Sequence, residues 1–217
     1  MIPPEYLNQI VTGDARVLAE RIPDASVDLI FTDPVYSERP LYDWLGMVAR
    51  RVLKPTGAVL CWSNGKWHHD NTRWLEDAGL TYRYDFAHAQ IRMGAAFNGK
   101  IVSKSNRITW LDIDGRSTMR DYIIDGFAEP TYRLPGAFHW GKSFVYTVMA
   151  MRAFPGTVLD PFTGQGTVPA AAQTLGRNYI AFEIDPDTAA RARARVEATQ
   201  AMHPVFLEEQ HAMELAS

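Results

Sequence analysis

Residues 27–36, VDLIFTDPVY, join an apolar run to a carboxylate, a proline and an aromatic ring. The Asp33 carboxylate and the Pro34 carbonyl can both accept hydrogen bonds from an amino group, and proline fixes the backbone angle that aims this carbonyl. Tyr36 offers a face on which a planar ring can stack. Asp-Pro is also common in turns. By itself, this segment leaves two interpretations open: a turn that ends a strand, or a site for a flat ring with an exocyclic amine.

A second candidate segment, residues 160–167, reads DPFTGQGT. Glycines placed between a strand and a helix let a ligand approach the backbone beside the N–H groups that begin the helix. Glu183 ends the next apolar stretch, where a carboxylate can accept hydrogen bonds from both hydroxyls of a ribose. The dinucleotide pattern GxGxxG is incomplete, because Pro169 replaces the third glycine. The pair fits an adenosine-type cofactor, and a structural turn with a surface glutamate is the other interpretation.

The chain around these segments alternates between strand and helix patterns. Strands are expected at residues 10–11, 27–31, 58–62, 157–160 and 179–184, and helices at 41–53, 67–78, 144–153, 168–175 and 189–196. Repeated strand–helix units imply an α/β domain with a mostly parallel sheet. Ligands of such sheets bind beyond the carboxyl ends of the strands. The polar residues at these ends are Asp14, Asp33, Asp160 and Glu183.

The composition is ordinary for a soluble globular protein, with 217 residues, 47% hydrophobic and 22% charged. No apolar run is long enough to cross a membrane and no secretory signal is recognisable, so a cytoplasmic protein is expected. Cys61 is the only cysteine, which excludes an internal disulfide and a cysteine-rich zinc site; no metal is expected. The net charge of −3 argues against a protein that coats nucleic acid nonspecifically.

Taken together, the two segments resemble the β class of the S-adenosylmethionine-dependent amino-methyltransferases of DNA, in which the catalytic motif precedes the cofactor motif. The similarity runs over residues 8–64 and 136–197. It is carried by Thr12-Gly-Asp14, by the L-x-x-x-x-P-D-x-S-x-D spacing from Leu18 to Asp28, by Asp33-Pro-Val-Tyr36, by Arg51-Val-Leu-Lys-Pro55 and by Asp160 to Thr167. Val35 and Ser143 depart from the family, which usually has proline at both positions. The resemblance implies a single Rossmann-like methyltransferase domain over residues 1–217, with helices on both faces of the sheet and a circularly permuted motif order.

By this resemblance, Asp33, Pro34 and Tyr36 hold a base that is flipped out of double-stranded DNA. The residues implied to bind S-adenosylmethionine are Asp14, His139, Lys142, Ser143, Asp160, Phe162, Thr163, Gly164, Gly166, Thr167 and Glu183. Asp14 is expected at the adenine amine, Glu183 at the ribose and Lys142 at the methionine carboxylate. An aspartate at the head of the catalytic motif favours N6 of adenine as the target, whereas a serine favours N4 of cytosine. The expected activity is adenine-N6 methylation of DNA, as in restriction-modification systems.

Residues 80–135 lack the strand–helix rhythm and are interpreted as a short inserted target-recognition region. A base inside a duplex cannot reach a buried strand end, so the enzyme must extrude it and hold the surrounding phosphates. The cations suited to phosphates are Arg92, Lys100, Lys104 and Arg107. Because the region is short, a short recognition sequence or help from a second subunit is expected. The second subunit could be another copy of this chain, which would make the enzyme a homodimer.

Three other interpretations remain at the level of the sequence. The same chemistry could act on N4 of cytosine or on a base in RNA. A noncatalytic DNA-binding protein could retain the fold, but the intact Asp33, Tyr36 and Glu183 count against it. A nicotinamide-dependent oxidoreductase could use the glycine turn, but the missing third glycine and the unexplained Asp-Pro-Val-Tyr segment count against that class.

Overall fold

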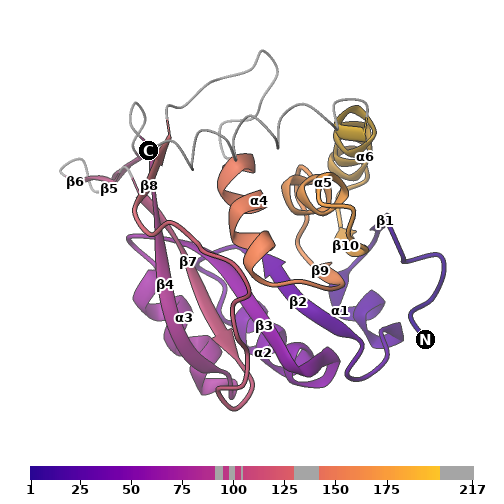
Figure 1. The fold of residues 1–217 in the computed structure, drawn as a ribbon, viewed down its shortest axis with the longest axis horizontal. Helices are drawn as coiled ribbons and strands as arrows, with labels where there is room; N and C mark the ends of the chain where they lie inside the picture. The colour runs from indigo at the N-terminus through magenta and orange to yellow at the C-terminus, as the bar shows by residue number, and fades with distance from the viewer. Residues whose placement is uncertain (91–94, 98–100, 104, 130–141, 201–217) are drawn as a thin grey trace.

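A computed structural model describes residues 1–90, 95–97, 101–103, 105–129 and 142–200, and within them the chain forms an eight-stranded sheet. The order of the strands is β1-β10-β9-β2-β3-β7-β4-β8 (Figure 1). These strands are β1 Gln9–Thr12, β2 Val27–Thr32, β3 Leu53–Asn64, β4 Thr81–Gln90, β7 Ser105–Asp112, β8 Phe127–Glu129, β9 Val158–Asp160 and β10 Tyr179–Glu183. A separate two-stranded sheet pairs β5 Ala95–Phe97 with β6 Ile101–Ser103.

The sheet is mostly parallel, as the sequence predicts. Strands β1, β10, β9, β2 and β3 run parallel to one another, and β7 is antiparallel to both β3 and β4. The helices are α1 Ala15–Leu18, the 3-10 turn η1 Ala19–Arg21, α2 Arg39–Val52, α3 His68–Asp77, α4 Phe144–Ala153, α5 Thr167–Thr174 and α6 Pro186–Gln200. None of the described helices is long and apolar enough to span a membrane.

Helices cover both faces of the sheet, because successive residues of a buried strand point to opposite faces. Helices α4, α5 and α6 lie on one face of the sheet and α1, α2 and α3 on the other (Figure 1). On β2, the side chains of Leu29 and Phe31 pack into the core with residues of α4, α5 and α6, whereas Ile30 packs into the core with residues of α1, α2 and α3. All three side chains are fully buried. This architecture is the Rossmann-like methyltransferase fold that was expected.

Residues 80–135, which the sequence suggests are an insertion, contribute two long strands to the main sheet. Strand β7 pairs with β3 from Asn106 to Asp112, and β4 pairs with β7, so both belong to the main sheet. The sequence pattern concealed β4 because its polar side chains are satisfied by distant partners. Arg83 donates to Asp112 at 3.0 Å, and Asp85 lies 2.8 Å from the ring of His68 on α3.

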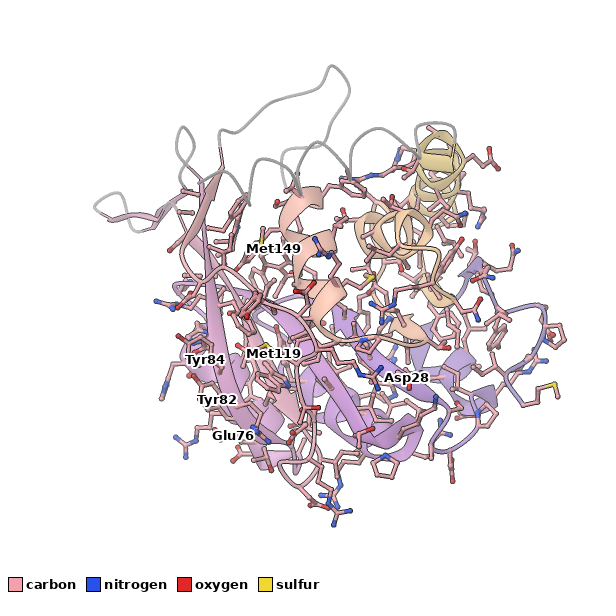
Figure 2. All side chains as sticks on the ribbon, viewed as in Figure 1. Asp28, Glu76, Tyr82, Tyr84, Met119 and Met149 are labelled. Carbon is pink, nitrogen blue, oxygen red and sulfur yellow. The ribbon has the colours of Figure 1, made fainter. Side chains whose placement is uncertain are left out.

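Two tyrosines of β4 have side chains that are partly exposed to solvent. Tyr82 and Tyr84 are 40% and 46% exposed and lie at the side of the molecule that is formed by this strand (Figure 2). The hydroxyl of Tyr84 donates to Asp125 at 3.0 Å, and the same carboxylate accepts the backbone N–H of Ala87 at 2.8 Å. Asp125 therefore satisfies a backbone donor that a strand at this position would otherwise leave unpaired.

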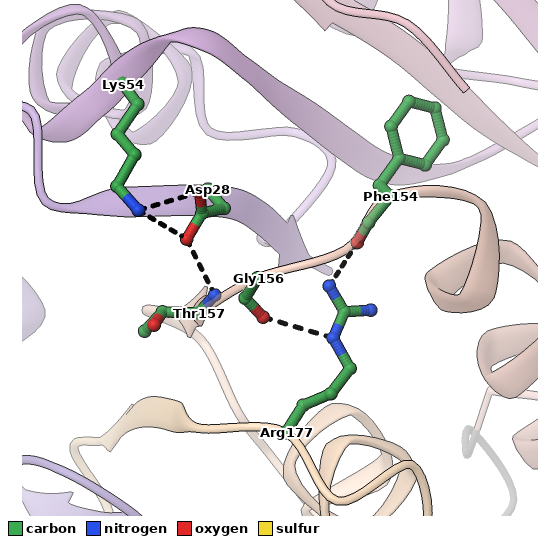
Figure 3. Close-up of polar contacts among 6 residues, drawn as sticks. All are labelled: Asp28, Lys54, Phe154, Gly156, Thr157 and Arg177. Atoms are coloured by element: carbon green, nitrogen blue, oxygen red, sulfur yellow. Dashed lines mark hydrogen bonds and ion pairs between the residues drawn. The ribbon is translucent and has the colours of Figure 1, made fainter. Parts of the chain in front are cut away.

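Charged side chains tie the amino ends of the central strands together, at the edge of the sheet opposite the strand ends discussed below. Asp28 at the start of β2 accepts hydrogen bonds from the Lys54 ammonium at 2.8 Å and from the Thr157 N–H at 2.8 Å (Figure 3). Arg177 donates to the carbonyls of Gly156 and Phe154 in the turn that follows α4 (Figure 3). These contacts hold the chain between α4 and β9 against β2.

Candidate active site

The carboxyl end of β2 presents Asp33 and Tyr36 as a bonded pair. The Tyr36 hydroxyl donates to Oδ1 of Asp33 at 2.8 Å. The backbone carbonyl of Tyr36 accepts a hydrogen bond from Nδ2 of Asn71 at 2.8 Å, so α3 holds the end of the motif. Pro34 is buried, whereas the side chain of Val35 is 56% exposed. The segment Asp33–Tyr36 is thus a fixed structure that displays a carboxylate and an aromatic ring.

The Tyr36 phenol stays protonated at any physiological pH. Burial, and then the negative charge of Asp33, raise the pKa of Tyr36 far above its usual value. A protonated phenol donates its only hydrogen to Asp33 and retains lone pairs that can accept a hydrogen bond. The hydroxyl therefore fixes one oxygen of Asp33 and leaves the other oxygen open to other donors.

The cofactor motif begins on the neighbouring strand. Strand β9 pairs directly with β2, with Leu29 opposite Val158 and Ile30 opposite Leu159. The Thr32 hydroxyl donates to Oδ1 of Asp160 at 2.8 Å and links the two strand ends. Both motifs predicted from the sequence are thereby brought to adjacent positions on one edge of the sheet.

Asp160 is buried, with only 3% of its surface exposed. Burial raises its pKa to about 7, and the hydrogen bond from Thr32 acts in the opposite direction. The Thr163 hydroxyl donates to the Asp160 backbone carbonyl at 3.1 Å, and the Phe162 ring packs edge-on against Trp44 of α2 at a centroid distance of 5.6 Å. The start of this motif is therefore held by a local hydrogen bond and by packing against α2.

The glycine turn leaves free space where a ligand could approach. Gly164 has φ +52°, and no atom lies within 4 Å of the position that a Cβ would take there. Gly166 has φ +76° and begins α5, and a Cβ on it would lie 3.1 Å from Ala192 of α6. Gly164 is thus open toward solvent, whereas Gly166 is required by close packing between two helices.

Glu183, at the end of β10, is aimed at this turn. Its carboxylate accepts the N–H of Gly164 at 2.8 Å on one oxygen and the N–H of Asp185 at 2.9 Å on the other. Each carboxylate oxygen can accept a second hydrogen bond, so the group is fixed in orientation and still able to bind two hydroxyls. The residues of this part of the site fit an adenosine group with its ribose.

The other predicted cofactor residues have structural partners as well. Asp14 caps α1 and forms an ion pair with Arg16 at 2.6 Å, and hydrogen bonds from Arg16 lower the pKa of Asp14. The Ser143 hydroxyl caps α4 by accepting the N–H of Tyr146 at 3.0 Å. Thr167 accepts a hydrogen bond from Arg195 at 2.9 Å. These three side chains therefore already stabilise the ends and packing of helices.

Lys142 lies with the catalytic motif. Its ammonium group is 3.0 Å from Oδ2 of Asp33 and donates a hydrogen bond to the Tyr36 hydroxyl. Its side chain is only 15% exposed. The position at the methionine carboxylate that the sequence predicts for Lys142 stays a prediction.

The predicted nucleic-acid residues are described only in part. Arg107 lies near the start of β7, opposite Ser63 of β3, at the same edge of the sheet as the catalytic motif. Arg92, Lys100, Lys104 and His139 lie outside the described residues.

Three residues that hold the site were not expected from the sequence. Thr32 joins the two motifs, Asn71 holds the Tyr36 carbonyl and Trp44 packs on Phe162. Only Thr32 carried a signal, because it is a polar residue that directly follows the apolar run Leu29–Phe31 at the end of the strand. Asn71 and Trp44 sit on helices where nothing in the local pattern separates them from other side chains.

The fold and the two adjacent motifs define an S-adenosylmethionine-dependent methyltransferase, and comparison with known proteins agrees. The family model described as DNA methylase, of the N6/N4 type, matches residues 149–193. The Type II methyltransferase M.BglII of Bacillus subtilis is 31% identical over an alignment 248 positions long, which covers 85% of this chain and 68% of the relative. The chain therefore belongs to the family of DNA amino-methyltransferases that act on adenine N6 or cytosine N4.

Solved structures have the same fold. The complex of M1.HpyAVI with S-adenosylmethionine superimposes with a TM-score of 0.71 and 19% identity, and the match covers 87% of this chain and 98% of that one. The PvuII DNA methyltransferase, described as cytosine-N4-specific, superimposes with a TM-score of 0.71 and 15% identity, over 89% and 90% of the two chains. The cofactor of the present protein is S-adenosylmethionine, and its substrate is DNA.

Proposed function

We propose that the chain is a single-domain enzyme that methylates the exocyclic N6 amine of adenine in double-stranded DNA. The observation that carries this proposal is the position of the Asp33–Tyr36 pair directly beside Asp160, on the paired strands β2 and β9 and linked by Thr32. A group held at Asp33 and a group held at the glycine turn would lie at one edge of the sheet. This proximity is what transfer between two bound molecules requires.

On the acceptor side, the residues have to hold and orient a weak nucleophile. The lone pair of an exocyclic amine is delocalised into its ring, so the amine must be turned toward the methyl donor. The Asp33 carboxylate and the Pro34 carbonyl can accept its two N–H groups, and the Tyr36 ring can stack on the base. A carboxylate at this place also stabilises the positive charge that develops on the nitrogen. Asp33, Pro34 and Tyr36 are thus proposed as the catalytic residues.

On the other side, S-adenosylmethionine supplies the methyl group from a sulfonium centre. We assign its ribose to Glu183 and its adenine to the surroundings of Asp14 and Phe162. The open backbone at Gly164 supports close approach of the cofactor there. Asp160 has a pKa of about 7, so it changes charge in the range where the enzyme would work.

DNA is proposed to lie over the carboxyl edge of the sheet. Arg107 belongs to this edge, and we assign to it, with Arg92, Lys100 and Lys104, contacts to phosphates around a flipped base. Residues 80–135 are the proposed target-recognition region, and the strands β4 and β7 within them belong to the main sheet. A homodimer would double this basic surface, and light scattering with and without DNA tests that proposal. Because the substrate is DNA, we expect the enzyme to act in the cytoplasm.

Methylation of cytosine N4 is the second candidate. A fold shared with a cytosine-N4-specific enzyme supports it, since both amines present the same N–H groups to the site. The aspartate at position 33 favours adenine by the family resemblance. Two further alternatives, methylation of a base in RNA and noncatalytic DNA binding, are compatible with the same fold. Neither would produce a methylated DNA nucleoside.

Transfer of tritiated methyl from S-adenosylmethionine to unmethylated bacterial DNA, followed by mass spectrometry of the nucleosides, tests the proposal. N6-methyldeoxyadenosine is the expected product. N4-methyldeoxycytidine would keep the mechanism and correct the target. Absence of any methylated nucleoside, with cofactor binding measured in the same sample, would contradict a DNA methyltransferase that acts alone.

A further inference from the structure

The ammonium group of Lys142 occupies the place that the target amine is proposed to take. It lies 3.0 Å from Oδ2 of Asp33, the oxygen that Tyr36 leaves open. It also donates a hydrogen bond to the Tyr36 hydroxyl and lies 5.0 Å from the centroid of that ring, at the hydroxyl end of the ring. Lys142 thus contacts both groups that the base needs.

An ammonium and an exocyclic amine compete for this carboxylate. Both are nitrogen donors of similar size, and Asp33 Oδ1 is already bonded to the Tyr36 hydroxyl. A cation retained on Asp33 would also oppose the positive charge that develops on the target nitrogen during transfer. Although each Asp33 oxygen can accept a second hydrogen bond, this repulsion means that methyl transfer is favoured when the ammonium has left Asp33.

The position of Lys142 is built into the fold. It directly precedes Ser143, whose carbonyl and hydroxyl are bonded to Thr147 at 2.6 Å and to Tyr146 at 3.0 Å in the first turn of α4. The ammonium also lies 5.8 Å from the ring of Trp62, a buried residue of β3. Helix α4 and strand β3 thus hold the side chain between the sheet and the catalytic motif.

We propose that Lys142 is a positioning residue that fills the acceptor site in the free enzyme and leaves Asp33 when the target base enters. This inference rests on the proposed function of Asp33 and Tyr36. In the free enzyme the cation compensates the charge of Asp33, which lies near the carboxylate of Asp160. On entry of the base, its amine replaces the ammonium as donor to Asp33.

The cost of this arrangement is a lower apparent affinity for the base. When a binding-competent state is only fractionally populated, the apparent dissociation constant rises by the inverse of that fraction. If the ion pair is closed in about nine-tenths of the free molecules, its removal tightens productive DNA binding about tenfold. A lysine that contacts DNA phosphates would have the opposite effect, because loss of its charge weakens binding.

The test compares K142M and K142Q with the wild-type enzyme, with K142R and with K54M. Lys54 also pairs with an aspartate, Asp28, at 2.8 Å, but at the opposite edge of the sheet, so K54M removes an equivalent ion pair away from the site. The KM for unmethylated plasmid DNA, kcat and the Kd for S-adenosylmethionine are measured for each protein, and circular dichroism verifies folding.

The KM for DNA is expected to fall about tenfold in K142M and K142Q. It should stay at the wild-type value in K54M and K142R. The Kd for S-adenosylmethionine should change by less than about twofold in all four variants. An unchanged or raised KM for DNA in both uncharged variants overturns the inference. So does a cofactor Kd that rises with the KM for DNA unchanged, since Lys142 would then serve the cofactor. A wild-type enzyme that methylates no DNA overturns the proposed function itself and is distinguished by that first measurement.

Discussion

Asp33 and Glu183 carry the same charge at the ends of parallel strands, but we expect them to serve different ligands. Asp33→Ala should lower kcat for DNA methylation by more than about a hundredfold, because the group that orients the amine and stabilises its charge is lost. Cofactor affinity should be retained, because Asp33 bonds to Tyr36 and Lys142 rather than to the glycine turn. Tritium transfer and calorimetric titration with S-adenosylmethionine measure the two effects.

Glu183→Gln is the matched variant at the other site. It preserves size but removes the charge that holds two backbone N–H groups and is proposed to bind the ribose. The Kd for S-adenosylmethionine should rise about 10- to 100-fold, as for loss of charged hydrogen bonds. If Asp33→Ala abolishes cofactor binding and Glu183→Gln does not change it, the division of the site into two halves is wrong.

Asp160 should make the protein less stable as the pH rises. Its pKa is about 7 in the folded protein, whereas the ordinary value for an aspartate is 3.8, so the folded state binds more protons than the unfolded chain between these values. The free energy of unfolding therefore decreases as the pH rises through this window, by about 3 kcal/mol between pH 5 and pH 8 from this residue alone.

Urea denaturation of the wild type and of Asp160→Asn at pH 5, 6, 7 and 8 measures this contribution as a difference. The asparagine can still accept the hydrogen bond from Thr32 and does not titrate. The free energy of unfolding of Asp160→Asn, relative to that of the wild type, should therefore increase with pH. The increase should level off above pH 7, where the wild-type carboxyl is ionised in both the folded and the unfolded state. A difference that is constant over this range would show that Asp160 is already ionised at pH 5.

At the scale of elements, the turn between β9 and α5 contains two glycines with different roles. Gly166 is needed for helix packing, whereas Gly164 is open to a ligand. Gly166→Ala should lower the free energy of unfolding by more than about 2 kcal/mol, because its φ of +76° and a contact of 3.1 Å with Ala192 both oppose a side chain. Gly164→Ala should cost only about 1 kcal/mol, because its surroundings are open.

The two alanine variants should also differ in cofactor binding. A methyl group at position 164 would project into the space that is proposed for the cofactor, so Gly164→Ala should raise the Kd for S-adenosylmethionine although the protein remains folded. Thermal unfolding with and without the cofactor compares them. Equal loss of stability in both variants would contradict the assignment of Gly166 to helix packing.

At the scale of the whole molecule, Arg177 connects α5 and β10 to the turn that follows α4. Its guanidinium donates to the carbonyls of Phe154 and Gly156 (Figure 3) and to that of Met151. Burial lowers the pKa of Arg177 to about 10. Arg177→Met leaves these carbonyls without their charged donor and should cost about 2–4 kcal/mol of stability.

The exposed Arg73 on α3 provides the control for this change. Arg73→Met also removes one positive charge, so it accounts for the general effect of charge on stability. Denaturation with urea should place the midpoint of Arg177→Met well below that of Arg73→Met. Similar midpoints would mean that water satisfies the three carbonyls when the guanidinium is absent.

The sequence alone predicted the elements that local patterns encode. The strands predicted at residues 27–31 and 58–62 lie within β2 and β3, and the glycines at positions 164 and 166 mark a turn before a helix. These features depend on the preferences of a few consecutive residues, namely β-branched runs, helical spacing and positive φ angles. The class of fold followed from their order.

Contacts between distant residues were decided only by the tertiary structure. Strands β4 and β7 join the main sheet by pairing with each other and with β3, and Arg83 and Asp85 of β4 find partners on other elements, which no local pattern records. The bond from Thr32 to Asp160 joins residues 128 positions apart in the chain. The sequence determined which chemical groups end each strand, whereas the packing of β2, β9 and α4 decided that Lys142 meets Asp33, since long-range partners are selected by the assembled sheet and helices together.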